Sequence, residues 1–378
     1  MLTTRRRFLQ DTSAIAAVTP LILTGCGHHV ITAPRLPVTE TLQSAGRRNG
    51  IFVGSAVDVR ALRESPAYAE LIRTQCSIVV AENAMKFGPL RPSSEAYFFD
   101  DADYLVDFAQ RNGILVRGHN FVWHRQLPHW FEKEATPANA ERLLVEHIER
   151  VGGRYAGRIH SWDVCNEVIQ LEDGQPGGLR NSPWFKLLGP RYIDLAYRTA
   201  RRVDPKALLC YNDYDIESEA PAHAAKRAAV LQLLRGLQER GVPLDGLGIQ
   251  GHIAADEKHI YGAGLTNFMT TVQGMGLKLM VTEMDVNDRA LPGAPDLRDR
   301  QVADRYASFL STTLANRNTI ALLTWGLTDK YTWLNGEDSR ADHLPERCLP
   351  FDADLQPVPA FAAELQALAQ APRRPYSR

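Results

Sequence analysis

The sequence predicts an α/β protein in which a single catalytic domain forms a (β/α)8 barrel. Three observations support this fold class. Eight short β-rich runs alternate with helical stretches, a pattern typical of a parallel sheet. The connections between the runs are long enough to carry crossover helices, and the 378 residues exceed the ~250 that one such barrel needs. Polar side chains gather at the ends of the runs, where barrel enzymes carry their catalytic groups.

The eight runs are expected to be the barrel strands. They are Ile51–Val57, Ser77–Ala81, Ile114–His119, Ile159–Cys165, Ala207–Asn212, Gly246–Gln250, Lys278–Thr282 and Ile320–Trp325. A doubly wound open sheet is the alternative arrangement of the same elements. No GxGxxG turn follows the first run, so the most common purpose of an open sheet, dinucleotide binding, has no support in the sequence.

Apolar residues at helical spacing mark the connecting segments. In Asn139–Val151 they recur with the period of one helix face, and Tyr192–Arg202 and Ala222–Arg240 behave similarly. Gly241 provides a natural end for the third of these helices. A last helix is expected near Ala360–Ala369. With 44% hydrophobic residues the chain can bury a sizeable core.

The N-terminal 26 residues predict an export signal. Thr4-Arg5-Arg6-Arg7-Phe8-Leu9-Gln10 resembles a twin-arginine signal, and Leu23-Thr24-Gly25-Cys26 resembles a lipobox. We therefore expect residues 1–26 to be the signal, 27–45 a Pro- and Thr-containing linker, and 46–372 the barrel. An acylated Cys26 would anchor a periplasmic or outer-membrane lipoprotein without a transmembrane helix. The alternative is an ordinary secretory peptide, cleaved after a small residue such as Ala33.

Charge and cysteine content bound the remaining possibilities. A formal net charge of −1 gives no electrostatic attraction to nucleic acid. After residue 30 no stretch approaches the ~18 apolar residues of a membrane span. The widely spaced Cys76, Cys165, Cys210 and Cys348 form no CxxC pattern, so a structural zinc site is not expected. Buried free thiols are the favoured reading and one disulfide is the alternative. We expect a monomer.

Residues suited to chemistry follow seven of the runs. They are Glu82, Asn83 and Lys86; His119, Asn120, Trp123 and His124; Asn166 and Glu167; Asn212 and Tyr214; Gln250 and His252; Glu283 and Asp285; and Trp325 with Trp333. Each alone is unremarkable, because loops are polar and a lone Glu is usually solvated. Two carboxylates from different strands at one barrel mouth are the arrangement that glycosidic cleavage needs. Glu167 and Glu283 are therefore the candidate pair.

The segments around these residues resemble glycoside hydrolase family 10, the xylanases. The resemblance rests on five segments that occur in family order between about residues 46 and 365. They are Ala81-Glu82-Asn83-Ala84-Met85-Lys86, Arg117-Gly118-His119-Asn120-Phe121-Val122-Trp123-His124, Trp162-Asp163-Val164-Cys165-Asn166-Glu167, Val281-Thr282-Glu283-Met284-Asp285-Val286 and Trp325-Gly326-Leu327-Thr328-Asp329-Lys330-Tyr331-Thr332-Trp333. Cys165 and Met284 depart from the usual family residues, and neither is a reacting group.

The resemblance implies a retaining endo-1,4-β-xylanase that acts on xylan and xylo-oligosaccharides without a cofactor. Glu167 would be the acid/base and Glu283 the nucleophile. Asn166, His252 and Asp285 would support catalysis. The implied substrate-binding residues are Glu82, Asn83, Lys86, His119, Trp123, Asn212, Tyr214, Gln250, Trp325 and Trp333. Tryptophan rings would stack on sugar rings, and those near the last strand would crowd out a hydroxymethyl group and favour xylose over glucose.

Three alternatives remain open. An exo-acting β-xylosidase or a cellulase would use the same fold and the same carboxylates. A non-catalytic glycan-binding lipoprotein would lack one carboxylate, and both are present. A metallohydrolase would draw on His119, His124, His252, Glu283 and Asp285. Barrel metallohydrolases usually carry an HxH pair on the first strand, and Ile51–Val57 contains no His. We therefore expect no metal.

Overall fold

The computed structural model describes residues 40–336 and 339–375. The expected signal, residues 1–26, and residues 27–39 of the expected linker lie outside the described residues. No helix within the described ranges combines the length and the apolar character needed to cross a membrane.

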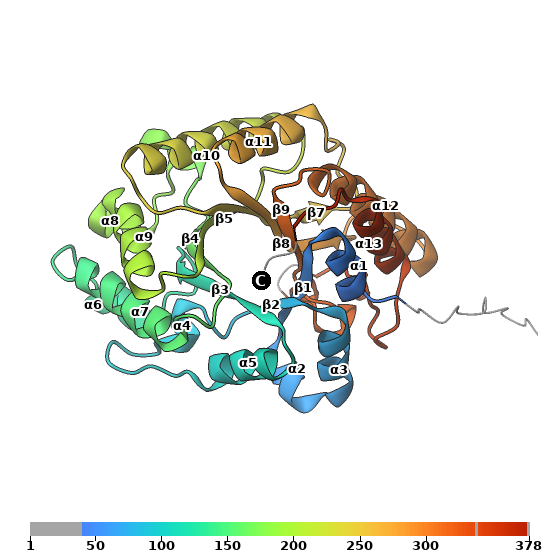
Figure 1. Ribbon diagram of the computed structural model, residues 1–378, viewed down its shortest axis with the longest axis horizontal. Helices are drawn as coiled ribbons and strands as arrows, with labels where there is room; N and C mark the ends of the chain where they lie inside the picture. Colours follow the sequence, from blue (N-terminus) through green and yellow to red (C-terminus); the bar gives the residue numbers. More distant parts are fainter. Residues whose placement is uncertain (1–39, 337–338, 376–378) are drawn as a thin grey trace, which may run out of the picture. The chain divides into compact units, whose positions relative to one another are not determined.

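Eight parallel strands of the described chain close into a barrel with helices around it, which confirms the predicted TIM barrel (Figure 1). The pairing follows chain order from β1 to β6, and β6–β8, β8–β9 and β9–β1 pairs complete the circle. The barrel strands are β1 (Phe52–Val57), β2 (Ile78–Ala81), β3 (Leu115–Val122), β4 (Ser161–Asn166), β5 (Leu208–Asp213), β6 (Gly246–Ile249), β8 (Lys278–Asn287) and β9 (Thr319–Thr324). Each begins within two residues of its predicted start.

Helices fill the connections and cover the outside of the barrel (Figure 1). They are α1 (Leu42–Asn49), α2 (Val59–Glu64), α3 (Pro66–Gln75), α4 (Phe87–Leu90), α5 (Asp100–Arg111), α6 (His129–Glu134), α7 (Ala140–Tyr155), α8 (Pro183–Leu188), α9 (Arg191–Val203), α10 (Pro221–Glu239), α11 (Ala263–Gly274), α12 (Pro295–Thr313) and α13 (Pro359–Gln370). The predicted helices correspond to α7, α9, α10 and α13. The core lies between these helices and the strands, with a smaller apolar cluster inside the barrel.

Two boundaries differ from expectation. Helix α1 begins at Leu42, inside the expected linker, because the Thr41 hydroxyl caps its first turn and Leu42 is buried. Strand β8 continues past Thr282 to Asn287, where it pairs with a short strand, β7 (His252–Ala254), that the sequence analysis did not predict. This extension carries Glu283 and Asp285 on a rigid strand.

Close packing fixes the strand register near the site. A Cβ added to Gly118 of β3 would lie 1.9 Å from the Trp162 ring of β4, so only glycine fits beside that ring. Trp162 is fully buried and stacks on Phe121 at 4.1 Å between ring centroids. The four cysteines Cys76, Cys165, Cys210 and Cys348 are buried free thiols, as predicted.

Glu364 of α13 yields a prediction about stability. Its side chain is fully buried, and neither carboxylate oxygen has a partner within the described ranges. Burial raises the pKa of Glu364 to about 8. Between pH 4.5 and 8 the unfolded chain releases a proton that the folded chain retains, so stability falls as pH rises. Glu364→Gln should therefore raise the free energy of unfolding by about 3 kcal/mol at pH 7, at 1.36 kcal/mol per pKa unit.

Urea unfolding at pH 5 and pH 7 checks this. The gain from Glu364→Gln should fall to about 1 kcal/mol at pH 5, because that pH lies only about half a unit above the ordinary pKa of 4.5 that applies in the unfolded chain. Glu239→Gln, at an exposed position of α10, is the matched control and should change little at either pH. An equal gain at both pH values would show that Glu364 is not the titrating group.

Candidate active site

A cleft of about 690 Å³ opens at the C-terminal ends of the strands. Most of the candidate residues from the sequence line it, although they come from seven different strands or the loops that follow them. These are Glu82, Asn83, Lys86, His119, Trp123, Asn166, Glu167, Tyr214, Gln250, His252, Glu283, Trp325 and Trp333. Parallel strands in a closed barrel bring all their carboxyl ends to one rim, which is why residues so far apart in sequence meet.

Two candidates lie beneath the cleft instead of lining it. Asn212, which the resemblance implied as a substrate contact, is fully buried and donates hydrogen bonds to Glu283 (2.6 Å) and Asn166 (2.9 Å). Its amide therefore links the two carboxylate-bearing strands and does not face the opening. Asp285 is also buried, behind His252.

Glu167 follows β4 and receives three hydrogen bonds. The indole of Trp123 donates to Oε2 at 2.8 Å, and the amides of Asn166 and Gln250 each donate to Oε1 at 3.0 Å. His124 lies 3.7 Å from Oε2. Burial and then the charge of Arg180 lower the pKa of His124 to about 3, so this ring is neutral beside Glu167. The carboxyl group is fixed in orientation, with part of its surface open to the cleft.

The backbone of Glu167 is held in an unusual conformation. Its φ of 56° lies in the left-handed region, which costs a residue with a side chain about 1–3 kcal/mol. The Glu167 amide donates to the Asn212 carbonyl at 2.9 Å, and its own carbonyl accepts from Arg180 Nε at 2.7 Å. Arg180 also donates to the Tyr214 hydroxyl at 3.1 Å. These bonds hold the turn that points Glu167 into the cleft.

Glu283 lies within β8 and is held ionised. Burial favours the neutral acid, but the charge of His119, the hydrogen bond and charge of His252, and the charge of Lys86 together lower the pKa of Glu283 to about 2. His252 Nε2 is 3.3 Å from Glu283 Oε2, and His119 Nδ1 is 3.9 Å from Oε1. Glu283 is therefore a carboxylate across the neutral pH range.

His252 connects Glu283 to a second carboxylate. Burial disfavours its charge, but Asp285 and Glu283 raise the pKa of His252 well above its usual value. The charged ring donates to Asp285 Oδ1 at 2.9 Å and to Glu283. Trp333 donates to Asp285 Oδ2 at 2.7 Å. The orientation of Glu283 and that of the Trp333 ring at the cleft rim are thus set by one carboxylate.

The opposite wall carries a polar group on the loop after β2. Lys86 donates to Asn83 at 2.9 Å, and its Nζ lies 5.1 and 5.5 Å from the ring centroids of Trp123 and Trp325. Burial lowers the pKa of Lys86, while Glu283 and Glu82 oppose that shift. Burial and the charge of Asp58 raise the pKa of Glu82 to about 7. This wall offers donors and acceptors next to flat apolar rings.

One group of described residues has the spacing of metal ligands: His119, Asp163 and Glu283 offer atoms within 4.8 Å of one another. These atoms are already engaged. Asp163 is paired with the buried Arg117 and with His119 at 3.0 Å, and Glu283 accepts from Asn212. The positive charge of Arg117, which is paired with Asp163, would repel a metal cation bound at the same place. The chemistry of the donor set therefore does not fit a metal centre.

Some site residues escaped the sequence analysis. Arg125 and Gln126 line the cleft directly after the Trp123-His124 pair, so their position in the chain was the available signal. Arg180 lies 13 residues beyond Glu167, and nothing in the local sequence indicates its contact with the Glu167 carbonyl.

Comparisons with known proteins agree on one family. The family model of glycosyl hydrolase family 10 matches residues 41–367. The chain is 36% identical over 323 residues to the thermostable celloxylanase of Thermoclostridium stercorarium, covering 78% of this chain and 80% of that one. It is 34% identical over 341 residues to endo-1,4-beta-xylanase B of Paenibacillus barcinonensis, covering 84% and 96%.

A solved structure gives the same result for the fold. Xylanase 10B of Thermotoga petrophila RKU-1, in complex with xylobiose, superposes with a TM-score of 0.78 at 32% identity. The match covers 87% of this chain and 97% of that one.

The charge balance at Glu283 can be tested directly. His252→Gln removes the positive charge next to Glu283, so its pKa should rise from about 2 toward the ordinary value of 4.5. Titration of the ¹³C-labelled carboxyl groups by NMR measures this, with Glu283→Gln identifying the resonance.

The matched control is His129→Gln, because the side chain of His129 is 77% exposed at the start of α6. It should leave the Glu283 titration unchanged. If Glu283 titrates equally low without His252, the hydrogen-bonded histidine is not what holds it ionised.

Proposed function

The chain belongs to glycosyl hydrolase family 10, and from this premise we propose that it is an endo-1,4-β-xylanase that retains the anomeric configuration. The observation that carries the proposal is the pair Glu167 and Glu283, which line one cleft in contrasting surroundings. Glu283 is surrounded by cations that keep it ionised, whereas Glu167 contacts uncharged donors and a neutral His124. Two carboxyl groups with different surroundings suit the two roles in glycosidic cleavage.

In the first step Glu283 attacks the anomeric carbon of the bound sugar. The bond from that carbon to the glycosidic oxygen breaks, and the proton of Glu167 passes to the leaving oxygen. A covalent ester between the sugar and Glu283 results. The hydrogen bonds from Asn212 and His252 fix the attacking carboxylate against rotation, so little reorganisation is needed during attack.

In the second step Glu167 takes a proton from water, and the water oxygen attacks the same carbon. The ester bond to Glu283 breaks and the carboxylate is regenerated. Formation of the ester removes the negative charge of Glu283, which makes an ionised Glu167 easier to sustain and fits its change from acid to base. Asn166 lies beside Glu167 and is proposed to donate to the sugar 2-hydroxyl.

The remaining cleft residues are proposed to hold the polysaccharide. Glu82, Asn83 and Lys86 would bind hydroxyls of a sugar on one side of the cleavage point. Trp325 and Trp333 would provide apolar faces and limit the space for a hydroxymethyl group, which favours xylose over glucose. Trp333 is 39% exposed at the rim, where its ring is available to a sugar. Tyr214 would line the aglycone side.

The product profile on unbranched xylan and on carboxymethyl-cellulose tests the substrate. We expect xylo-oligosaccharides from xylan and little product from cellulose, using protein that lacks residues 1–30. Release of xylose alone would instead indicate an exo-acting enzyme, and efficient cellulose cleavage would make it a cellulase. Binding of xylan without cleavage would favour a glycan-binding protein.

Alanine variants test the two roles separately. Glu283→Ala should abolish hydrolysis of every substrate, and azide should not restore a product of retained configuration. Glu167→Ala should lower kcat/KM on xylan by about 10²–10⁴-fold, the usual contribution of a general acid. It should retain more activity on aryl xylosides, whose leaving groups need no proton.

Steady-state rates on xylan and on an aryl xyloside provide the measurement. Glu172→Ala, at an exposed position in the loop after β4, is the control and should keep normal rates on both. Equal losses on the two substrates in Glu167→Ala would contradict the acid/base assignment.

A further inference from the structure

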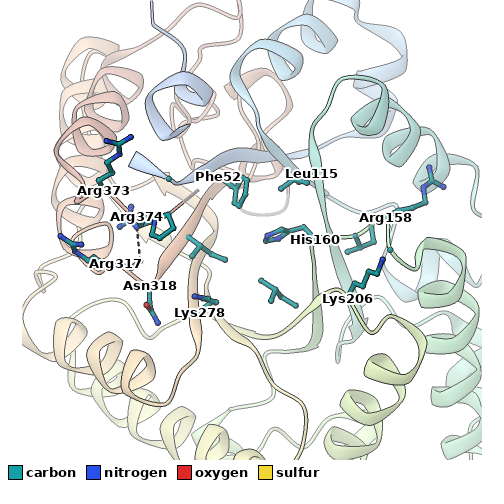
Figure 2. Close-up of a pocket in the computed structure, with 16 residues that line it drawn as sticks. Phe52, Leu115, Arg158, His160, Lys206, Lys278, Arg317, Asn318, Arg373 and Arg374 are labelled. Atoms are coloured by element: carbon teal, nitrogen blue, oxygen red, sulfur yellow. Dashed lines mark hydrogen bonds between the residues drawn. The ribbon is translucent and has the colours of Figure 1, made fainter. Parts of the chain in front are cut away.

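A second recess lies at the opposite end of the barrel from the cleft. It has a volume of about 600 Å³ and is lined by residues at or near the N-terminal ends of β1, β3, β4, β5, β8 and β9 (Figure 2). Its size falls within the range of small-molecule sites, which is about 300–1,000 Å³. The proposed xylanase reaction does not use it, because the catalytic residues lie at the other ends of the same strands.

The floor of the recess is apolar. Leu115 and Leu208, the first residues of β3 and β5, and Ile320, the second residue of β9, contribute half-buried side chains. Phe52, the first residue of β1, also lines the recess but is only 3% exposed. The ring of His160 packs edge-on against Phe52, with 5.3 Å between ring centroids. Burial and then the charge of Arg117 lower the pKa of His160 to about 4, so the ring is neutral at pH 7. The floor therefore suits an uncharged hydrocarbon or aromatic body.

The wall of the recess is strongly basic. Its charged members are Arg158, Lys206, Lys278, Arg317, Arg373 and Arg374, and the described lining includes no Asp or Glu. Arg158 is neutralised by Asp107. None of the other five forms an ion pair with a described residue within 4 Å. Figure 2 shows Arg317, Arg373 and Arg374 on one side of the floor and Arg158 and Lys206 on the other.

Arg374 shows most clearly that no acidic side chain of the described residues balances this charge. It is 6% exposed, yet its partners are three backbone carbonyls, those of Leu314, Asn316 and Arg317, near the end of α12. Its Nη1 has no acceptor among the residues that the structure describes. Its bonds to the carbonyls at the end of α12 explain why Arg374 is buried without an acidic partner. No such contact explains the positions of Lys206 and Lys278 across the recess.

We propose that this recess binds an amphipathic organic anion, with a carboxylate, sulfonate or phosphate group attached to a ring system or a short apolar chain. The apolar body would lie on the floor formed by Leu115, Leu208 and Ile320, and the anionic group would meet the cations of the wall. Bringing together cations that have no acidic partner among the described residues is unfavourable, and a bound anion offsets this cost. A flat bilayer fits a recess poorly, which favours a small ligand over a membrane surface.

A pair of dyes separates the anionic group from the apolar body. The probe 1-anilinonaphthalene-8-sulfonate should bind the full chain carrying Cys26→Ala, whereas N-phenyl-1-naphthylamine, which lacks the sulfonate, should bind at least about tenfold more weakly, the effect of one favourable charge contact. Fluorescence titration measures both. Binding of the sulfonate should weaken with added salt. Equal affinity for the two dyes would overturn the proposal.

Charge reversal locates the dye. Lys278→Glu combined with Arg317→Glu should weaken sulfonate binding by about tenfold or more. Both side chains are exposed at the wall, so the fold should survive, which urea unfolding checks. Arg235→Glu, an equal charge change at an exposed position of α10 outside the recess, should leave the affinity within about twofold, as expected for a distant exposed charge.

Two further measurements can contradict the assignment. Displacement of the sulfonate dye by xylo-oligosaccharide would place the dye in the catalytic cleft and overturn the proposal without affecting the proposed activity. Failure of the dye to bind, together with binding to phosphatidylglycerol vesicles and not to phosphatidylcholine vesicles, would make this face a membrane contact. If xylan is not cleaved but the dye results hold, the recess stands and the proposed function fails.

Discussion

A carboxylate that is almost fully buried must be kept ionised at Glu283, and much of the cleft is arranged around that requirement. Burial alone would neutralise it, so positive charge has to come from nearby. His252 supplies it through a direct hydrogen bond, and Asp285 in turn sustains the charge on His252. The charges of His119 and Lys86 also lower the pKa of Glu283. Removing any one of these charged groups would therefore change the electrostatic stabilisation of the others.

The barrel makes this arrangement possible because it places each group on a separate rigid strand. Asn212 of β5 donates to Glu283 of β8 and to Asn166 of β4, so the strands that carry the two carboxylates are tied together below the cleft. One layer further down, the buried pair of Arg117 and Asp163 fixes His119. Two hydrogen bonds hold the strained backbone of Glu167 in place. Its carbonyl accepts from Arg180, and its amide donates to the carbonyl of Asn212.

Local sequence patterns predicted the fold well because barrel strands are short, buried and β-rich. Every expected strand is present, and Glu167 and Glu283 follow or occupy the strands to which they were assigned. The strand β7 was missed because His252–Ala254 is too short to show a period and depends on pairing with β8. Helix α1 was not predicted, and its first residues were assigned to the linker, because this helix depends on the Thr41 cap and on burial against the barrel.

Contacts between distant residues were the main limit on predicting the site. The resemblance implied Asn212 as a substrate contact, but only the pleat of β5 decides that its side chain turns inward beneath the cleft. Arg180 could not be recognised, since its role is a contact with a backbone carbonyl. The basic recess was equally hidden, because its lysines and arginines are dispersed between Arg158 and Arg374 and converge only when the barrel closes.

The central claim, that Glu167 and Glu283 act in a double displacement, is tested most directly by the configuration of the first product. Proton NMR can follow cleavage of a xylo-oligosaccharide within the first minutes, before the new reducing end equilibrates. The account predicts that the β-anomer appears first, because two successive inversions at the anomeric carbon restore its configuration. Initial appearance of the α-anomer would mean a single displacement by water, and Glu283 would then be a base and not the nucleophile.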